Sequence, residues 1–246
     1  MAVLSHEGTY AIMYGGFSVP VGAGYRPGYL ARPDKVGAFP TVVVIPDLNG
    51  LTSAEKDLCR HLARTGLAAL AIELYADPSD DPFANYASLS DRRAVTLLDE
   101  VHEFLASEDV DWAHAEALGL LGIDVGGRFA LAMAANRPWV RAAAVCYTPL
   151  TGDEARETQV ADLLDHLPVP ILGLYGVDDE FIDTSTVDEA QRRNHSGQWL
   201  LYDGAGHGFL DLEADSYHVD SAADALQRLT QFFLQTLPVD ESVDLG

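Results

Sequence analysis

Short apolar segments that alternate with stretches of helical spacing most constrain what this chain can fold into. Thr41-Val-Val-Val-Ile45 is a continuous, mostly β-branched run, which is typical of a parallel strand covered on both faces. Similar apolar runs occupy residues 67–74, 117–123, 140–147, 170–175 and 198–202. Helical spacing follows at residues 52–66, 90–105, 127–136, 185–193 and 221–237. This alternation predicts an α/β fold, with a mostly parallel central sheet and helices on both faces.

The segments outside this alternation show other patterns. Residues 10–31 alternate and carry turn residues, so we expect N-terminal edge strands within residues 1–40. Residues 78–86 are rich in Asp, Pro and Asn and predict a surface loop. Residues 238–246 are acidic, and we expect this tail to fray. Because no repeat or long linker interrupts the sequence, we expect a single domain over residues 1–246.

The net charge, the lengths of the apolar runs and the number of cysteines together exclude several classes of protein. The 246 residues hold 15 Lys and Arg against 38 Asp and Glu, a formal charge of −23. Because this charge repels phosphate backbones, we expect no nucleic-acid partner. The apolar runs are far shorter than the ~20 residues of a membrane-spanning helix, and no secretory signal is visible. Two cysteines cannot form a disulfide framework, so a cytoplasmic protein is expected.

The distribution of the basic residues leaves the cause of this acidity open. Only Lys35 and Lys56 are lysines among the 15 bases. One explanation is adaptation to high salt, where a carboxylate-rich surface stays hydrated while its self-repulsion is screened. The other is a preference for Arg over Lys on an ordinary solvated surface. Thermal stability measured against NaCl distinguishes them, because only the first predicts a gain at molar salt.

The segment Gly122-Ile-Asp-Val-Gly-Gly127 carries the first chemical signal. It joins a predicted strand to a predicted helix, and the pattern small-x-X-x-small at such a junction describes a nucleophile elbow. Gly122 and Gly126 are needed because larger side chains would collide across the turn. The turn holds Asp124 above the sheet at a helix N-terminus, where the helix dipole favours a negative charge.

Two later loops supply partners for this position. Tyr175-Gly-Val-Asp-Asp-Glu-Phe-Ile182 follows one predicted strand, and Tyr202-Asp-Gly-Ala-Gly-His-Gly-Phe209 follows the next. The chain therefore presents an elbow residue, then an acidic loop, then a histidine. This is the order of the catalytic triads of α/β-hydrolases.

With these segments in place, the chain resembles the dienelactone hydrolase family over nearly its full length. The resemblance lies in Gly28-Tyr-Leu-Ala-Arg-Pro33, Val42-Val-Val-Ile-Pro-Asp-Leu-Asn-Gly-Leu51, Ala71-Ile-Glu-Leu-Tyr75, the elbow with its Gly-Gly-Arg128, Gly204-Ala-Gly-His-Gly-Phe209 and the Phe232-Phe233 helix. It implies a compact α/β-hydrolase without a large cap domain. Such proteins act on small esters or lactones with a Cys or Ser nucleophile, an Asp and a His.

The resemblance also implies roles for individual residues. They are Asp124 at the elbow, Asp179 as the triad acid, His207 as the base, and Leu48 and Val125 as donors of oxyanion N–H groups. Asp47 matches a family position that a glutamate usually holds. The departure is at the elbow, where a carboxylate replaces the family's thiol or hydroxyl.

An aspartate at the elbow leaves three functions open. Asp124 could attack an sp³ carbon of an epoxide or halide, because attack on an ester carbonyl would give an unfavourable anhydride. His207, oriented by Asp179, would then activate the water that hydrolyses the alkyl ester. In the second function Asp124 is a base or electrostatic element in ester or lactone hydrolysis. In the third the chain is a non-hydrolytic ligand-binding homologue with a degenerate triad.

Further side chains are expected at the substrate. They are Asp47, Tyr75, Tyr86, Arg93 and Tyr147, with the tyrosines as proton donors and Arg93 as a contact for an anionic group. Cys59 and Cys146 are interpreted as buried structural residues.

The remaining motifs concern cofactors and partners. The histidines are scattered without metal-ligand spacing, so we expect no metal. No phosphate loop or GxGxxG fingerprint occurs, so no nucleotide cofactor is implied. We expect a hydrolase of a small molecule, either a monomer or a homodimer.

Overall fold

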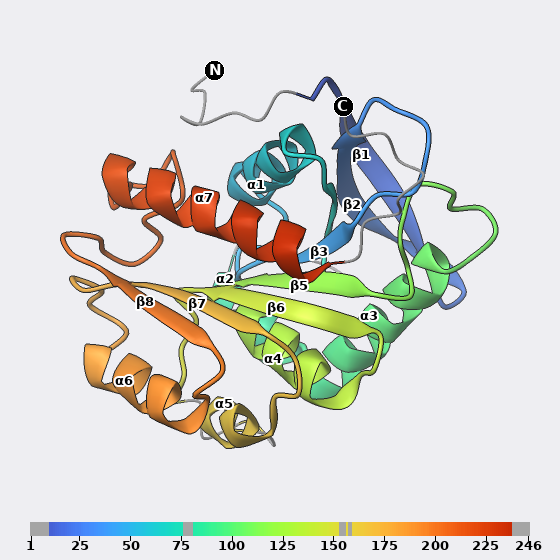
Figure 1. The fold of residues 1–246 in the computed structure, drawn as a ribbon. Helices are drawn as coiled ribbons and strands as arrows, with labels where there is room; N and C mark the ends of the chain where they lie inside the picture. The colour runs from blue at the N-terminus through green and yellow to red at the C-terminus, as the bar shows by residue number, and fades with distance from the viewer. Residues whose placement is uncertain (1–9, 76–80, 153–155, 157–158, 238–246) are drawn as a thin grey trace.

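The computed structural model describes residues 10–75, 81–152, 156 and 159–237. In these residues eight strands form one sheet in the order β1-β2-β4-β3-β5-β6-β7-β8 (Figure 1). The strands are β1 (Ile12–Val21), β2 (Gly24–Pro33), β3 (Thr41–Ile45), β4 (Ala68–Ile72), β5 (Leu118–Ile123), β6 (Val140–Cys146), β7 (Ile171–Gly176) and β8 (Gln198–Tyr202). Strands β3 to β8 run parallel to one another, whereas β2 pairs antiparallel with β1 and with β4.

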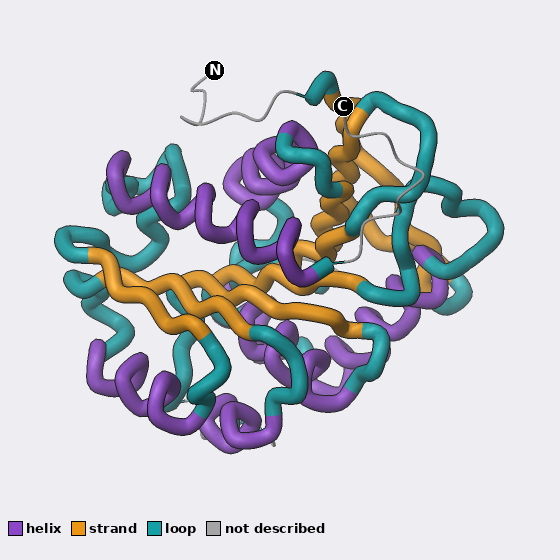
Figure 2. The backbone as a smooth tube through the Cα atoms, viewed as in Figure 1, coloured by secondary structure: helices purple, strands orange, loops and turns teal. Residues whose placement is uncertain are grey.

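Helices cover both faces of the sheet, as Figures 1 and 2 show. One face carries α1 (Ser53–Arg64) and α7 (Val219–Thr236), and the other carries α3 (Asp91–Leu105), α4 (Gly126–Asn136), α5 (Val160–Leu163) and α6 (Thr184–Arg193). The α/β architecture expected from the alternating sequence pattern is therefore confirmed. The strands expected near the N-terminus are β1 and β2, which pair as an antiparallel hairpin.

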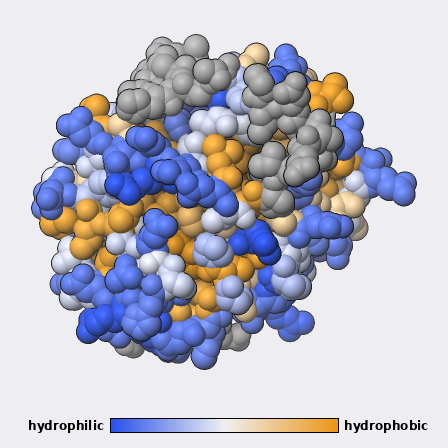
Figure 3. Space-filling view, in the orientation of Figure 1, coloured by the Kyte–Doolittle hydropathy of each residue, from blue (hydrophilic) through white to orange (hydrophobic). Residues whose placement is uncertain are grey.

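The central strands form the core because helices cover them on both sides. Every residue of β3, β4, β5 and β7 is buried, which explains why these strands are continuous apolar runs. The edge strand β1 instead has half-buried or exposed residues except at Val19 and Val21. In Figure 3, hydrophilic side chains cover the outer surfaces of α6 and α7, and hydrophobic ones lie between them.

Local capping explains where the helices begin. Thr52 caps α1 in a capping box, in which its side chain accepts from the first turn and Glu55 accepts from the Thr52 backbone N–H at 2.8 Å. Ser90 caps α3, since its hydroxyl accepts from the Arg93 N–H at 3.2 Å.

The prediction of a surface loop at residues 78–86 was wrong from residue 82 onward. Pro82–Ser88 form the helix α2, with Asp81 as its N-cap and Pro82 in its first turn. An Asp-Pro pair starts a helix well because Pro lacks the N–H that would be unsatisfied there. The short helix α5 and the 3₁₀ turn Leu164–His166 were not predicted.

Other expectations concern segments or properties beyond this description. Residues 76–80 of the expected loop and the acidic tail at 238–246 lie outside the described residues. The fraying of that tail and the single-domain organisation therefore stay predictions. Across the described residues, no helix combines the length and apolar character needed to cross a bilayer.

Candidate active site

Strand β5 and helix α4 meet in a turn that only glycines can build. A Cβ atom at Gly122 would lie 2.2 Å from the Cα of Gly127, and one at Gly126 would lie 2.3 Å from the carbonyl oxygen of Pro46. Between them Asp124 has a φ of 48°, in the left-handed region that non-glycine residues rarely adopt. The elbow predicted from the sequence therefore forms, with the strained residue at its centre.

Gly122→Ala is expected to lower the free energy of unfolding by about 3 kcal/mol or more, because the added methyl meets backbone that cannot rotate away. The matched control is Gly16→Ala in β1, where a Cβ would meet nothing within 4 Å. This change is expected to stay within about 1 kcal/mol of the wild type. Urea unfolding of the three proteins measures both values, and equal losses in the two variants would contradict the elbow argument.

Three side chains from separate loops converge at this turn. The Nδ1 atom of His207 lies 2.8 Å from Oδ2 of Asp179, and its Nε2 atom lies 3.5 Å from Oδ1 of Asp124. Asp179 is held by its own loop, since its Oδ1 accepts from the N–H groups of Phe181 at 2.9 Å and Ile182 at 3.1 Å. The elbow acid, the histidine and the second acid are thus aligned in the order expected for a triad.

Aromatic rings hold the imidazole from two sides. The ring of Tyr147 meets His207 edge-on at 5.1 Å, and the ring of Phe181 does so at 5.2 Å. Tyr147 is buried and has a φ of 40°, whereas Phe181 is 72% exposed. Tyr147 therefore lies at the site as expected. Phe181 was missed, although it belongs to the loop that carries Asp179.

The two carboxylates change the protonation of the histidine. Burial lowers the pKa of His207, but the hydrogen bonds and charges of Asp124 and Asp179 outweigh it and raise the pKa from 6.5 to about 9. At neutral pH the imidazole is therefore protonated and lies between two negative carboxylates.

This shift predicts a pH dependence of stability. Because the pKa of His207 is higher in the folded chain, its ion pairs contribute fully below about pH 6.5 and are lost as the pH rises through about 9. The contribution is up to about 3 kcal/mol. Urea unfolding between pH 6 and 9.5 should show a smaller decline in Asp124→Asn than in the wild type, and parallel curves would contradict the ion pair.

The loop after β3 holds Leu48, the expected oxyanion donor, directly after the ordered carboxylate of Asp47. Asp47 accepts from the Asn49 backbone N–H at 2.6 Å and from its side-chain amide at 2.9 Å. Burial raises the pKa of Asp47, and the neighbouring charge of Asp124 adds to this effect. Neither the Leu48 nor the Val125 N–H donates a hydrogen bond within the described part of the chain, and their binding of an oxyanion stays a prediction.

A buried glutamate that sequence reasoning missed braces this loop. Glu73 accepts from the Leu51 N–H and from the Tyr75 N–H, each at 3.0 Å. The Tyr75 hydroxyl in turn donates to the Asp47 carbonyl oxygen at 3.2 Å. Burial raises the pKa of Tyr75, so its hydroxyl stays protonated. Glu73 lies in the Ala71–Tyr75 segment that carries the family resemblance, but that resemblance gave it no role, because its contacts depend on two loops meeting in space.

A second buried carboxyl lies near the same loop. Glu55 is 1% exposed, and burial raises its pKa to about 7. Asp47 contributes to this shift through its charge. The Thr52-x-x-Glu55 spacing is the capping-box signal that could have identified Glu55 in advance.

The structure places Tyr86 and Arg93, which are also expected to contact the substrate, beside residues other than Asp124, Asp179 and His207. The ring of Tyr86 lies 3.9 Å from the guanidinium carbon of Arg156. Arg93 lines a separate cavity of about 100 Å³ together with Tyr75 and Arg26. Contact of Tyr86 and Arg93 with a substrate therefore stays a prediction.

The cysteines fit the structural role expected for them. Cys59 and Cys146 are both fully buried, and burial raises the pKa of each thiol. Cys146 also supports the elbow through its backbone, since its carbonyl oxygen accepts from the Asp124 N–H at 3.0 Å.

Comparison with known proteins identifies the family. A family model described as "Dienelactone hydrolase family" matches residues 27–237. The chain belongs to the dienelactone hydrolase family. A relative in Escherichia coli (strain K12), named "Putative carboxymethylenebutenolidase", is 33% identical over 243 residues, covering 92% of this chain and 88% of the relative. A Bradyrhizobium relative, named "Probable 2-oxo-3-(5-oxofuran-2-ylidene)propanoate lactonase", is 30% identical and covers 81% and 85%.

Comparison with solved structures supports the same family assignment. The crystal structure titled "Putative Dienelactone Hydrolase" from Klebsiella pneumoniae subsp. pneumoniae MGH 78578 superposes with a TM-score of 0.83. It is 32% identical, and the match covers 92% of this chain and 99% of that one. This member of the dienelactone hydrolase family is therefore a hydrolase rather than a non-hydrolytic homologue.

Proposed function

We propose that this hydrolase opens a small neutral epoxide through an alkyl ester formed on Asp124. The observation that carries the proposal is the alignment of the elbow carboxylate with a histidine, 3.5 Å away, that a second carboxylate orients. A carboxylate in this place forms a stable ester by attack on an sp³ carbon, whereas attack on a carbonyl would give an anhydride.

The first step uses the proton that the resting site holds. A carboxylate oxygen of Asp124 forms a bond to an epoxide carbon, and the C–O bond of the epoxide breaks with its electron pair on oxygen. The imidazolium of His207 donates its Nε2 proton to that oxygen. We assign this proton to His207 because the Tyr75 hydroxyl already donates to the Asp47 carbonyl oxygen.

The second step follows from the loss of charge on Asp124. Once Asp124 is esterified, its negative charge no longer raises the pKa of His207, which is one of the causes of the shift to about 9. The neutral imidazole then takes a proton from water as the water attacks the ester carbonyl. The N–H groups of Leu48 and Val125 stabilise the oxyanion. Collapse releases the diol and restores both the carboxylate and the imidazolium.

This proton cycle favours an epoxide over a halide. Epoxide opening consumes the proton in the first step and regains it in the second, so His207 starts and ends each turnover protonated. A departing halide takes no proton, so His207 would have to release its own proton to solvent before it could activate water. Halide displacement on Asp124 is therefore the slower variant of the same chemistry.

Ester or lactone hydrolysis is the second candidate, and the names of the relatives favour it. They include the proteins named "Putative carboxymethylenebutenolidase" and "Probable 2-oxo-3-(5-oxofuran-2-ylidene)propanoate lactonase". In this mechanism Asp124 acts as the base that activates water, and no covalent intermediate forms. The imidazolium of His207 would then stabilise the developing oxyanion rather than take a proton.

Trapping the ester distinguishes the two functions. In His207→Ala no base remains for the second step, while water must supply the proton of the first, so the ester should form slowly and then persist. Prolonged incubation with styrene oxide is therefore expected to add one substrate mass to the intact protein, with the label mapping to Asp124. The double variant Asp124→Asn/His207→Ala is the control and should gain no mass. An unmodified His207→Ala protein, together with lactone turnover that survives in Asp124→Asn, would contradict the covalent mechanism.

A further inference from the structure

We propose that the cavity lined by Arg26 and Arg93 binds a small oxyanion. This two-arginine cavity has a volume of about 100 Å³. Strand β2 supplies Arg26, helix α3 supplies Arg93, and the segment after β4 supplies Tyr75. The described residues that line it include no member of the catalytic alignment and no carboxylate. The inference is therefore independent of the proposed reaction.

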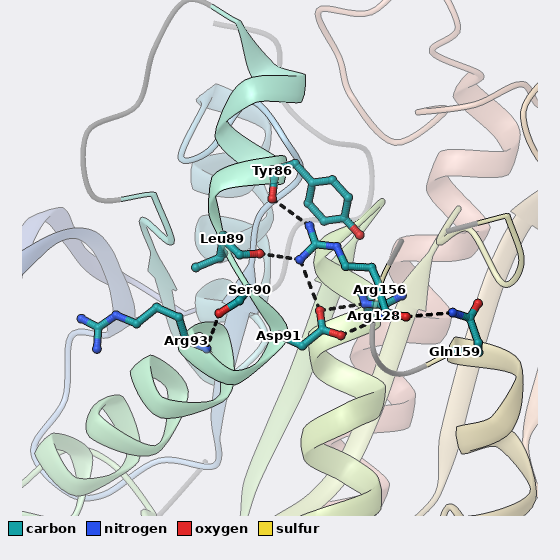
Figure 4. Close-up of polar contacts among 8 residues, drawn as sticks. All are labelled: Tyr86, Leu89, Ser90, Asp91, Arg93, Arg128, Arg156 and Gln159. Atoms are coloured by element: carbon teal, nitrogen blue, oxygen red, sulfur yellow. Dashed lines mark hydrogen bonds and ion pairs between the residues drawn. The ribbon is translucent and has the colours of Figure 1, made fainter. Parts of the chain in front are cut away.

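Neither guanidinium group has a partner in the part of the chain that the structure describes. The Nε atom of Arg26 is buried and has no hydrogen-bond acceptor there, and its guanidinium group forms no ion pair. The Arg93 backbone N–H donates to Ser90, but the Arg93 guanidinium group takes part in no hydrogen bond or ion pair with the described residues. In Figure 4 the Arg93 side chain extends away from the carboxylate of Asp91. The cavity therefore holds two positive charges without a negative charge at ion-pair distance.

The carboxylates that neighbour Arg93 on α3 are engaged elsewhere. Asp91 pairs with Arg128 at 2.9 Å. Glu100 faces the turn at Gly22, where an added Cβ would lie 3.4 Å from its Oε1 atom. Neither carboxylate pairs with an arginine of the cavity. In a chain whose total charge is −23, two arginines without acidic partners form a local site of opposite sign, which attracts an anion to a molecule that otherwise repels it.

The buried Nε–H group of Arg26 indicates what the ligand must provide. Folded proteins satisfy nearly all buried donors, because a donor without an acceptor loses its hydration and gains no hydrogen bond in return. A water molecule would supply an acceptor but no charge, whereas an oxyanion supplies both. Guanidinium groups bind the oxygens of carboxylates and phosphates in a planar, two-point geometry that a spherical chloride ion cannot match. The cavity therefore favours an oxyanion over water and over chloride.

The walls and the size of the two-arginine cavity limit the anion further. Leu74, Leu89 and Leu97 line it, and all three are buried. Apolar walls keep water away from the guanidinium groups, so their attraction for an anion is weakly screened. Drug-sized ligands occupy pockets of about 300–1,000 Å³, so a cavity of about 100 Å³ accommodates only a small group. The class of ligand is inorganic phosphate or a short carboxylate such as acetate.

Titration calorimetry with inorganic phosphate at constant ionic strength tests the site. The wild type is expected to bind one phosphate per chain, and acetate but not chloride should displace it. Arg93→Gln and Arg26→Gln are each expected to weaken phosphate binding at least about tenfold, because each removes one charge-assisted contact. Since Arg93 is exposed, Arg93→Gln should fold like the wild type, and thermal unfolding checks both variants.

Arg92→Gln is the matched control for Arg93→Gln. It removes the same charge from the neighbouring residue, which lines a different cavity. It should change the affinity less than about twofold, because a charge outside the site acts only through screened attraction. His207→Ala should bind phosphate like the wild type, because His207 does not line the two-arginine cavity.

Four results would overturn the proposal. The first is that the wild type does not bind phosphate. The second is that Arg92→Gln and Arg93→Gln weaken binding equally, which would show a general effect of charge. The third is that chloride displaces phosphate as well as acetate does. The fourth is that binding is lost in His207→Ala, which would place the anion at the catalytic imidazolium.

Discussion

Asp124→Asn is expected to reduce kcat on an epoxide substrate by at least about 10⁴-fold, because an amide oxygen is a far weaker nucleophile than a carboxylate. Asn has nearly the same shape and tolerates the left-handed backbone of the elbow. The loss should therefore come from chemistry rather than from misfolding. Steady-state kinetics measures it, and thermal unfolding at pH 7 checks that the variant is folded.

A second variant, Asp179→Asn, distinguishes the role of Asp124 as nucleophile from the role of His207 as base. Asp179→Asn leaves the elbow carboxylate in place but weakens the orientation of His207, so the ester should still form and then hydrolyse slowly. Rapid-quench mass spectrometry should therefore detect the ester in Asp179→Asn and none in Asp124→Asn. Full epoxide turnover by Asp124→Asn would rule out the covalent role of Asp124.

Asp124→Cys is expected to lose epoxide opening and to gain ester hydrolysis. A thiol at the elbow lies next to the imidazolium of His207, which stabilises the thiolate and makes it an effective nucleophile toward carbonyl carbon. Hydrolysis of 4-nitrophenyl acetate should rise at least 100-fold over the wild type, while epoxide turnover is lost. The first turnover should show a burst of nitrophenol, because the thioester forms faster than it hydrolyses.

The control for this exchange is Asp124→Ala, which keeps His207 and Asp179 but has no nucleophile. It should hydrolyse neither the epoxide nor the ester above background. If the wild type already cleaves the ester as fast as Asp124→Cys, then Asp124 acts as a base in water-mediated hydrolysis. That result would favour the second candidate function.

The sequence predicts the parts of this molecule that depend on neighbours along the chain. The β-branched run at residues 41–45 identifies a buried strand, because a strand covered on both faces is built mainly from apolar residues. The glycines around Asp124 identify the elbow for the same local reason. The helix at Pro82–Ser88 was missed because Asp, Pro and Asn also favour turns, and packing decides between the two.

Residues that act across space could not be predicted in this way. Glu73 joins the loops after β3 and β4, and nothing in its sequence neighbours indicates either contact. Phe181 packs against His207 only because two loops after adjacent strands meet. The order elbow, acid, histidine along the chain indicates which three side chains form the site. The raised pKa of His207, however, depends on how close the two carboxylates lie to it in the folded chain.

The two left-handed residues at the ends of β5 and β6 have an evolutionary consequence. Asp124 and Tyr147 have φ values of 48° and 40°, and such a conformation costs a non-glycine residue of the order of 1–3 kcal/mol. Glycine at either position would relax the backbone and make the fold more robust. Selection for heat resistance alone should therefore favour glycine at two positions whose side chains contact His207, so that a more stable descendant would keep the fold and lose its chemistry.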